Sequence, residues 1–514
     1  MIRQFEQSHS AFHSSYEKFM GMVDQLESKK IRSLNHRELE DHLKIEGREL
    51  LRRLFQDQID SLGVGDVGRA VIGTDNIMRN EKRVRNRQLI TIFGKVNIKR
   101  MGYGSFRKES LFPKDALLNL PTDLYSHGIR RLVAIESSKN SFSETMQAVE
   151  EITGVKMSKR EAEKLSLKAS EHFYLYYLQK GKKEQVENQD LPLVILTVDG
   201  KGIVMKKEDL KEETRKKSEE KASHKFNKRR SKGEKSNRKR MATVASVYNV
   251  DKFIRTSEDI VREFNSIKLD DEKVRPKAVN KRVWASIERE QGEVINDLFL
   301  EGLRGDPEKK KSWVCLVDGD PKQIKRVNSL SKKYNIKLTI VVDIIHVIEY
   351  LWKAGRDFYK ETDPDLEDWV TERLLRILHG NASGVAAGIR RSATLKKLKN
   401  EERKSVDRCA NYLLKKSPYL KYDYYLREGY PIATGVIEGA CRHLIKDRMD
   451  VTGARWTLKG AEAVIKLRSL RSSRDFEGYW KFHEEQEYYE NYLSKYLDPA
   501  VIHGEGKSFE KLPP

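Results

Sequence analysis

Two strand-like apolar runs in this sequence end in the same three residues, Val-Asp-Gly. Asp199 precedes the last glycine of the run LPLVILTVDG (191–200), and Asp318 precedes the last glycine of the run WVCLVDG (313–319). A third acid, Glu438, lies near the start of a predicted helix in GVIEGACRHLIK (435–446). A carboxylate inside an apolar run risks losing its hydration, so these three acids are the first candidates for chemistry.

Three carboxylates that converge repel one another, and their pKa values rise unless a cation lies between them. Mg²⁺ prefers oxygen ligands and keeps several waters. Two such ions can stabilise the attacking and the leaving oxygen of an in-line displacement at phosphorus. We therefore interpret Asp199, Asp318 and Glu438 as catalytic, metal-binding residues for two Mg²⁺ ions, with Mn²⁺ as a substitute. The alternative is structural, because an aspartate at a strand end also accepts backbone N–H groups in ordinary turns.

The surrounding pattern predicts a mixed β-sheet with helices. After the strand of Asp199 we expect a hairpin over 242–248 and 253–256, a helical stretch over 279–305, the strand of Asp318 and a helix over 321–335. A further strand carrying Asp343 and His346 leads into a helical block that extends to about residue 430. Adjacent parallel strands would bring Asp199 beside Asp318, and a packing helix would add Glu438.

Charge restricts the class of partner. The 514 residues carry a formal net charge of +22, which favours an anionic partner, most commonly nucleic acid. No apolar stretch reaches the 18 residues of a membrane span, so we expect no membrane association. The N-terminus lacks the layout of a secretory signal, and the three cysteines are far apart and form no disulfide pattern. We therefore expect a protein of a reducing compartment.

Two segments are candidates for DNA contacts. A helix capped near Ser143 should end at Thr153-Gly154, and a second should begin at Ser158 with a capping box to Glu161. This is a helix-turn-helix candidate that offers Lys159, Arg160 and Lys164 to DNA, although an ordinary helical hairpin gives the same pattern. The tract HKFNKRRSKGEKSNRKR (224–240) has nine Lys or Arg and one Glu, which predicts a mobile basic loop. Its candidate DNA-binding residues are Arg229, Arg230, Arg238, Lys239 and Arg240.

Cations also accompany the acids. Arg442 and Lys446 follow Glu438 by four and eight residues, so they share its helix face and can hold a phosphate backbone. Lys201 follows Asp199 by two residues and has the same two interpretations, a DNA contact or a turn residue. For the helix, the alternative is a set of i,i+4 salt bridges on a solvated face.

These segments together resemble the ISKra-type family of bacterial insertion-sequence transposases. The likeness is carried by LTVDGKGIVMKKE, KGEKSNRKRMATVASVYNV, WVCLVDGDPKQI, TIVVDIIHVIEYLWKAG and IATGVIEGACRHLIKDRMDVTGARW, in that order, and covers about 191–483. The resemblance implies an RNase H-like catalytic domain with a helical insertion and a triad at Asp199, Asp318 and Glu438. Asp343 competes with Asp318 for the second position, but only Asp318 is followed by a glycine turn, so we assign Asp343 and His346 an accessory role.

The implied organisation is an α+β (mixed) protein with a mainly helical DNA-binding region before the catalytic domain. We expect a helical region at 1–80, a β-hairpin element at 81–125 that turns near Phe93-Gly94, and a helix-turn-helix-like segment at 126–190. The remaining expected segments are the catalytic core at 191–348 with its basic mobile loop at 206–240, the helical insertion at 349–430, the end of the core at 431–485 and a C-terminal tail at 486–514.

The implied function is that of a DDE transposase, which binds the terminal repeats of its own element, cleaves DNA and transfers the freed strand to target DNA. Pairing two ends requires a homodimer or a larger oligomer, in the bacterial cytoplasm near the nucleoid. Two alternatives stay open at this point. One is an inactive transposase-derived regulator that only binds DNA, and the other is an RNase H-like nuclease that cleaves DNA without joining it.

Overall fold

The computed structural model describes residues 10–183, 191–222, 238–264, 274–433, 435–451 and 453–503 of the chain. The chain divides into two compact units. The first comprises Met1–Tyr176 together with Phe476–Pro514, and the second comprises Tyr177–Asp475. Within the described ranges, no helix has both the length and the apolar character needed to cross a bilayer.

The first unit begins with helices, as expected. Its N-terminal elements are η1 (Ser10–Phe12), α2 (His13–Glu27), α3 (Lys29–Arg32) and α4 (His36–Ser61). Helix α4 starts with a capping box between Asn35 and Glu38, and the Asp57 carboxylate accepts the Ser15 backbone N–H at 2.9 Å. The prediction of helix up to residue 80 is wrong beyond Ser61, because β1 (Val71–Ile72) pairs there with β2 (Met78–Arg79).

The predicted hairpin is confirmed. Strands β3 (Glu81–Thr91) and β4 (Gly94–Gly104) pair antiparallel along their whole length, with Thr91 opposite Gly94 at the turn. Gly94 has φ 127°, a conformation that residues with a Cβ rarely adopt. One face of the hairpin packs the buried side chains of Leu89, Val96 and Ile98 against Ile59 of helix α4 and against Leu120, which lies in the segment after the hairpin.

The helix-turn-helix candidate forms two helices with the predicted turn. Helix α7 (Phe142–Thr153) ends at Gly154, which has φ 71°, and α8 (Lys159–Lys168) starts with the expected capping box between Ser158 and Glu161. The N-cap of α7 is Ser141, two residues before the predicted position, because Glu144 closes a capping box with that serine. The flanking helices are α5 (Pro113–Leu117), α6 (His127–Lys139) and α9 (Phe173–Lys183).

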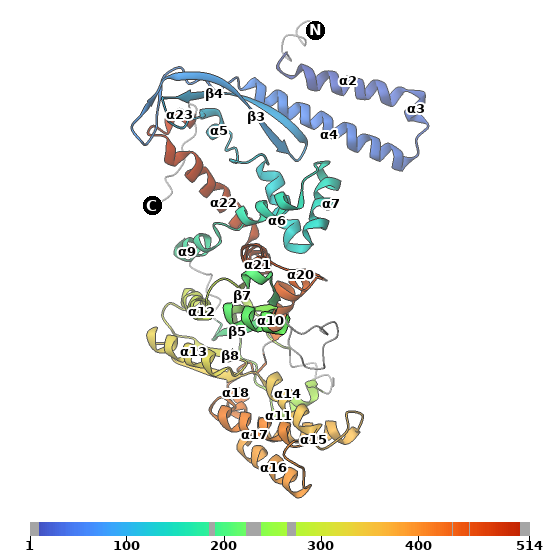
Figure 1. Ribbon diagram of the computed structural model, residues 1–514, viewed down its shortest axis with the longest axis vertical. Coiled ribbons are helices and arrows are strands. Elements are labelled where there is room, and N and C mark those ends of the chain that lie inside the picture. Colours follow the sequence, from blue (N-terminus) through green and yellow to red (C-terminus); the bar gives the residue numbers. More distant parts are fainter. Residues whose placement is uncertain are drawn as a thin grey trace. The chain divides into compact units, whose positions relative to one another are not determined.

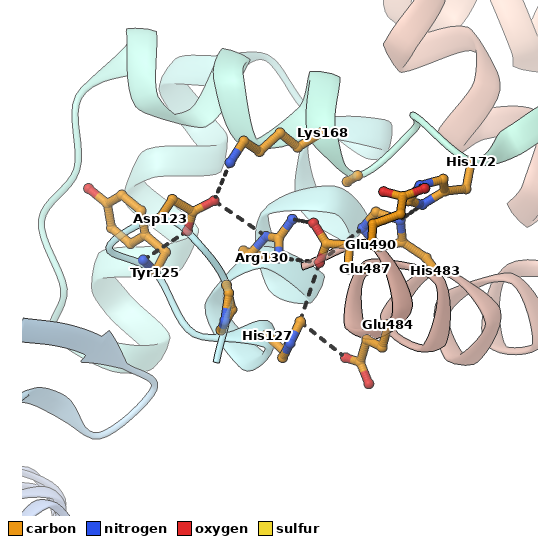
Figure 2. Close-up of polar contacts among 12 residues, drawn as sticks. Asp123, Tyr125, His127, Arg130, Lys168, His172, His483, Glu484, Glu487 and Glu490 are labelled. Atoms are coloured by element: carbon orange, nitrogen blue, oxygen red, sulfur yellow. Dashed lines mark hydrogen bonds and ion pairs between the residues drawn. The ribbon is translucent and has the colours of Figure 1, made fainter. Parts of the chain in front are cut away.

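The C-terminal segment belongs to the first unit. Helix α22 (Phe476–Asn491), η5 (Leu493–Lys495) and α23 (Ala500–His503) lie there, so residues 486–503 are not a free tail. Figure 2 shows Arg130 of α6 between Asp123 and Glu487 of α22. Both terminal nitrogens of Arg130 donate to the Glu487 carboxylate at 2.5 Å. Burial raises the pKa of Glu487, but the pairing with Arg130 outweighs this effect, so the pKa lies below its usual value.

The second unit contains a five-stranded mixed sheet in the order β7-β6-β5-β8-β9. Strand β6 is antiparallel to both of its neighbours, β7 and β5, whereas β8 and β9 run parallel to β5. In chain order this arrangement is 3-2-1-4-5, that of an RNase H-like sheet, so the predicted fold class is confirmed. The strands are β5 (Leu193–Val204), β6 (Lys239–Val250), β7 (Val279–Ser286), β8 (Ser312–Val317) and β9 (Leu338–Val342).

Two sequence predictions in this unit are wrong. Residues 253–256 form no strand, so β6 does not turn back on itself, and the stretch predicted to be helical over 279–305 contains β7 before helix α12 (Gln291–Gly305). The last five residues of β7 are all buried, because α21 (Leu458–Ser472) packs against this strand. A fully buried strand loses its alternating pattern and is easily taken for part of a helix.

Helices complete the second unit. Figure 1 shows the helical insertion as a group of neighbouring helices beyond α14. Its elements are α14 (Ile344–Gly355), α15 (Pro364–Leu378), α16 (Ala382–Leu395), α17 (Lys404–Lys416), η3 (Ser417–Tyr419) and α18 (Tyr422–Arg427). The other elements are η2 (Lys207–Asp209), α10 (Glu212–Ala222), α11 (Ser257–Phe264), α13 (Pro321–Lys333), α19 (Gly435–Ala440), η4 (Cys441–Lys446) and α20 (Asp447–Met449).

Candidate active site

Three aspartates lie at neighbouring positions across the parallel half of the sheet. Strand β5 pairs with β8 up to Thr197 opposite Leu316, so two more residues along each strand lead to Asp199 and Asp318. Strand β8 pairs with β9 up to Val317 opposite Val342, and the next residues are Asp318 and Asp343. The carboxyl ends of parallel strands meet at one edge of a sheet, which is why residues 199, 318 and 343 converge.

Glu438 reaches the same place from helix α19. A cavity of about 340 Å³ is lined by Asp199, Asp318 and Glu438 together, and also by Asp343 and His346. The other charged residues on its wall are Lys201, Glu349, Arg442 and Lys446, together with Cys441. The structure thus brings the three predicted acids, the two predicted accessory residues and three predicted cations to one cavity.

Backbone groups and one thiol hold the first two acids. Asp199 accepts the Gly200 N–H at 2.6 Å and lies 3.2 Å from the Cys441 Sγ, which donates to its second oxygen. Asp318 accepts the Asp320 N–H at 2.8 Å in a turn that requires Gly319, with φ 93°. Tyr412 of the insertion donates its hydroxyl to the Asp318 backbone carbonyl at 3.2 Å.

Asp343 differs from Asp318 in exposure and in its local role. Asp343 is only 2% exposed and caps helix α14, with its Oδ1 accepting the Ile345 N–H at 2.8 Å. Asp318 is half-buried at the start of a loop, with its carboxylate at the cavity. This difference favours Asp318 as the more accessible second acid, and the role of each residue stays a prediction.

The helix that carries Glu438 is irregular. After α19 the backbone continues as the π-helical turn η4, which widens the helix and is a feature often found at functional sites. Arg468 of α21 donates to the carbonyl of Leu444 at 3.0 Å and also to the carbonyl of His443. These bonds satisfy two carbonyl groups of the turn.

Two acids of the cavity, Asp318 and Glu438, have pKa values above their usual ones. Burial raises the pKa of Asp318, and the nearby Asp199 adds to the effect, whereas the Asp320 N–H and His346 oppose it. Burial also raises the pKa of Glu438, together with Asp343, Asp199 and Glu349. Both shifts express the same condition, which is negative charge gathered in a partly desolvated space.

The donor set fits Mg²⁺, although the side chains are not arranged as a finished ion site. Among the described residues, no three His, Cys, Asp or Glu side chains lie close enough to hold a metal ion as they stand. No lysine or arginine of the described segments forms a salt bridge with Asp199, Asp318 or Glu438. Three oxygen-donor acids that lack a paired cation and repel one another match the ligands that Mg²⁺ takes.

The predicted cations fall into three groups. Lys201, Arg442 and Lys446 line the cavity, and Arg442 lies 3.6 Å from Asp447 rather than in the i,i+4 salt bridge with Glu438 that the alternative interpretation requires. On α8, Lys159, Arg160 and Lys164 are exposed. Arg229 and Arg230 lie outside the described residues.

The basic segment is only partly a loop. Residues 206–222 contain η2 and helix α10, and Lys239 and Arg240 begin strand β6. Arg238 and Lys239 are exposed, but Arg240 is half-buried and donates to the Ile287 carbonyl at 3.1 Å. Arg240 is therefore engaged in fixing β6 near β7, which the charge pattern did not reveal.

Two cavity residues were missed by the sequence analysis. Cys441 follows Glu438 by three residues, and Glu349 follows His346 by three residues, so helical spacing alone would have placed each on the face of its predicted neighbour. Burial and the Asp199 carboxylate raise the pKa of Cys441, so its thiol stays protonated and can donate to that carboxylate.

Comparison with known proteins gives little further information. No protein-family model and no curated protein sequence matches this chain. Among solved structures, one described as the Drosophila P element transposase strand transfer complex aligns with 74% of this chain and 83% of its own, at 9% sequence identity and a TM-score of 0.21. Because a TM-score this low does not establish a common fold, the case for function depends on the geometry of the cavity.

Proposed function

We propose that this protein is a DDE transposase of an insertion sequence, which cleaves DNA at the ends of its own element and joins the freed strand to target DNA. The observation that carries this proposal is the cavity shared by Asp199, Asp318 and Glu438 on an RNase H-like sheet. Three acids from segments more than a hundred residues apart gain nothing in stability from such an arrangement. Their convergence is therefore best understood as a requirement of function.

In this proposal the three acids hold two Mg²⁺ ions, and Asp343 and His346 support them. Bound Mg²⁺ supplies charge stabilisation at phosphorus and activates an attacking water or 3′-hydroxyl. Lys201, Arg442 and Lys446 bind the phosphates that flank the scissile bond. The Cys441 thiol keeps the Asp199 carboxylate turned towards the cavity by donating to one of its oxygens.

The reaction needs no covalent protein–DNA intermediate. Water first attacks the phosphodiester at the end of the element and releases a 3′-hydroxyl. That hydroxyl then attacks a phosphodiester of the target and displaces another 3′-oxygen, so each step exchanges one P–O bond for another. Two element ends have to be held together, which requires at least two copies of the chain, with Lys159, Arg160 and Lys164 of α8 available for the end sequences.

A strand-transfer assay tests the proposal. The substrates are a labelled oligonucleotide that carries the end of the element next to the gene of this protein, and a supercoiled target plasmid. We expect joining by the wild type in Mg²⁺ or Mn²⁺, and a loss of more than about 100-fold in Asp318→Asn, since a metal ion contributes several kcal/mol to such a step. Asp343→Asn should retain measurable joining. The control is Arg356→Gln, at the exposed C-terminal end of α14 and outside the cavity.

The other outcomes separate the alternatives. Cleavage without joining would identify a nuclease of the same fold. Specific binding to the element ends without any cleavage would identify a regulator. If Asp343→Asn lost all joining activity and Asp318→Asn kept it, the proposed reaction would stand, but Asp343 would replace Asp318 as the second catalytic acid.

A further inference from the structure

A second cavity, of about 590 Å³, lies entirely within the first unit. Its walls come from the hairpin strands β3 and β4, from the segment that leads into α5, and from the chain that follows helix α22. Four cations line it, Arg85, Arg87, Arg100 and Lys495, against two acids, Glu109 and Asp115. The cavity therefore carries an excess of positive charge. None of these residues belongs to the candidate active site.

The buried carboxylate of Asp115 forms ion pairs with two guanidinium groups. Asp115, which is 3% exposed, lies 3.1 Å from Arg87 through its Oδ2 and pairs with Arg100 through the same oxygen. One negative charge cannot neutralise both. Accordingly, burial and the neighbouring Arg87 lower the pKa of Arg100 to about 10. Within the described segments, the buried Arg100 Nε has no hydrogen-bond partner, and neither has the buried Asp115 Oδ1.

The two inner arginines are held in fixed positions. Arg87 donates to the Asp123 carbonyl at 2.8 Å and to the Pro121 carbonyl, while the Arg100 guanidinium lies 3.8 Å from the ring centre of Phe112. Arg85 is opposite Arg100 in the hairpin register and is exposed, so it stands at the mouth of the cavity on the same face. Lys495 reaches the wall from the C-terminal segment, 3.4 Å from Glu109.

Fixed guanidinium groups at the base of a cavity, with an exposed one at its mouth, suit an anion that accepts several hydrogen bonds. Arginine forks match the geometry of phosphate oxygens better than lysine does. The tyrosines on the wall do not offer a stacking face for a base. Tyr492 and Tyr496 are packed in an apolar cluster, and the Tyr492 hydroxyl donates to the Leu120 carbonyl at 2.5 Å.

We propose that this cavity binds a phosphate group of a nucleic-acid backbone, with Arg85 and Lys495 as the accessible contacts and Arg87 and Arg100 as the fixed base. The phosphate chemistry follows from the cavity alone. The choice of nucleic acid as its source rests on the proposed function. Because Lys495 comes from the C-terminal segment, the site forms only when that segment is in place beside the hairpin.

Two binding measurements on the full-length protein test this proposal, both in EDTA so that catalysis plays no part. The first follows a fluorescent 30-base-pair duplex by anisotropy across a range of KCl concentrations. The second titrates inorganic phosphate by calorimetry at constant ionic strength. The variants are Arg85→Gln and Lys495→Gln, whose side chains are not buried. The matched controls are Arg83→Gln, on the same strand outside the cavity, and Lys99→Gln, on the opposite face of the hairpin.

We expect each cavity variant to weaken DNA binding and to reduce the slope of log K against log[KCl] by about 0.9, the effect of one lost phosphate contact. Phosphate affinity should fall in the same two variants, and both controls should behave as the wild type. If only phosphate binding falls, the cavity takes a small phosphate ester and the nucleic-acid assignment is overturned. If the cavity variants and the controls lose DNA affinity equally and none changes phosphate binding, the site itself is refuted. Both readouts are independent of strand-transfer activity, so a failure of the proposed function in the strand-transfer assay leaves them unchanged.

Discussion

The buried pair of Arg130 and Glu487 allows a quantitative test of how the C-terminal helix is attached to the first unit. The residues are 357 positions apart in sequence, and Arg130 is 1% exposed. Removal of one partner leaves an uncompensated buried charge, which typically costs about 3–5 kcal/mol, whereas replacement of both by apolar residues is often close to neutral. We therefore expect Arg130→Met and Glu487→Leu each to destabilise the unit by about 3–5 kcal/mol.

Neighbouring groups place the two single variants differently in that range. In Glu487→Leu, Arg130 keeps Asp123 at 3.8 Å, so the cost should lie near the lower end. In Arg130→Met, the basic groups near Glu487 in the described segments are the rings of His127 and His483, at 3.9 Å and 3.8 Å, and these carry charge only when protonated. The double variant should recover most of the loss, which gives a coupling free energy of several kcal/mol.

Trp480 reports on this region, since it lies on α22 and the other five tryptophans belong to the second unit. Urea unfolding of 5-fluorotryptophan-labelled protein, followed through the Trp480 fluorine signal, measures the stability of the first unit by itself. Arg131→Met is the control, because Arg131 is more exposed and its ion pair with Glu477 lies on the surface. If the double variant loses as much stability as the two single variants combined, the explanation by a buried ion pair is refuted.

Three further predictions concern pH, packing and charge. Burial lowers the pKa of His483 to about 3, so the unfolded chain binds a proton at this residue more readily than the folded chain does. The free energy of unfolding of the first unit should therefore fall by up to about 1.4 kcal/mol per pH unit as the pH drops below about 6.5. Urea unfolding at pH 7 and pH 5 should show a smaller pH effect in His483→Gln than in the wild type. Gly302→Ala should lower the free energy of unfolding by about 1–3 kcal/mol, because the added Cβ would lie 2.5 Å from the Trp313 ring. Gly292→Ala on the same helix is the control, since its Cβ would lie 3.9 Å from the nearest atom, on Arg326, and it should not lower the midpoint of thermal unfolding. Asp318→Asn should raise the unfolding midpoint in EDTA, because it removes a carboxylate that is partly buried beside Asp199, and burial and Asp199 both raise the pKa of Asp318. Mg²⁺ should stabilise the wild type and not this variant, and an equal effect of Mg²⁺ on both would contradict the assignment of Asp318.

Local sequence signals were reliable where the structure depends on local chemistry. The capping box of Ser158 and Glu161, the turn at Gly154 and the hairpin turn at Gly94 all occur as predicted, because each is determined by a few adjacent residues. The repeated Val-Asp-Gly pattern also led to the cavity, since an acid at the end of a buried strand is an unusual choice.

Features that depend on contacts between distant segments were missed. Strand β7 is covered by α21, whose Glu462 accepts the Ile287 N–H at 2.9 Å, and nothing near residue 283 in the sequence indicates this cover. The C-terminal segment was taken for a tail because its partner, Arg130, lies in a helix hundreds of residues away. The hydrogen bond from Arg240 to the Ile287 carbonyl was missed for the same reason, since a basic tract looks solvated until its backbone partners are known.

The central claim is that Asp199, Asp318 and Glu438 hold the catalytic ions, and a change of ligand type tests it most directly. A thiolate is a poor ligand for Mg²⁺ and a better one for Mn²⁺. We predict that Asp318→Cys loses strand transfer in Mg²⁺ and regains part of it in Mn²⁺, whereas Asp318→Ala stays inactive in both. Asp343→Cys should show no such dependence on the ion. Equal activity of Asp318→Cys in Mg²⁺ and in Mn²⁺, or recovery by Mn²⁺ in Asp343→Cys alone, would contradict the account.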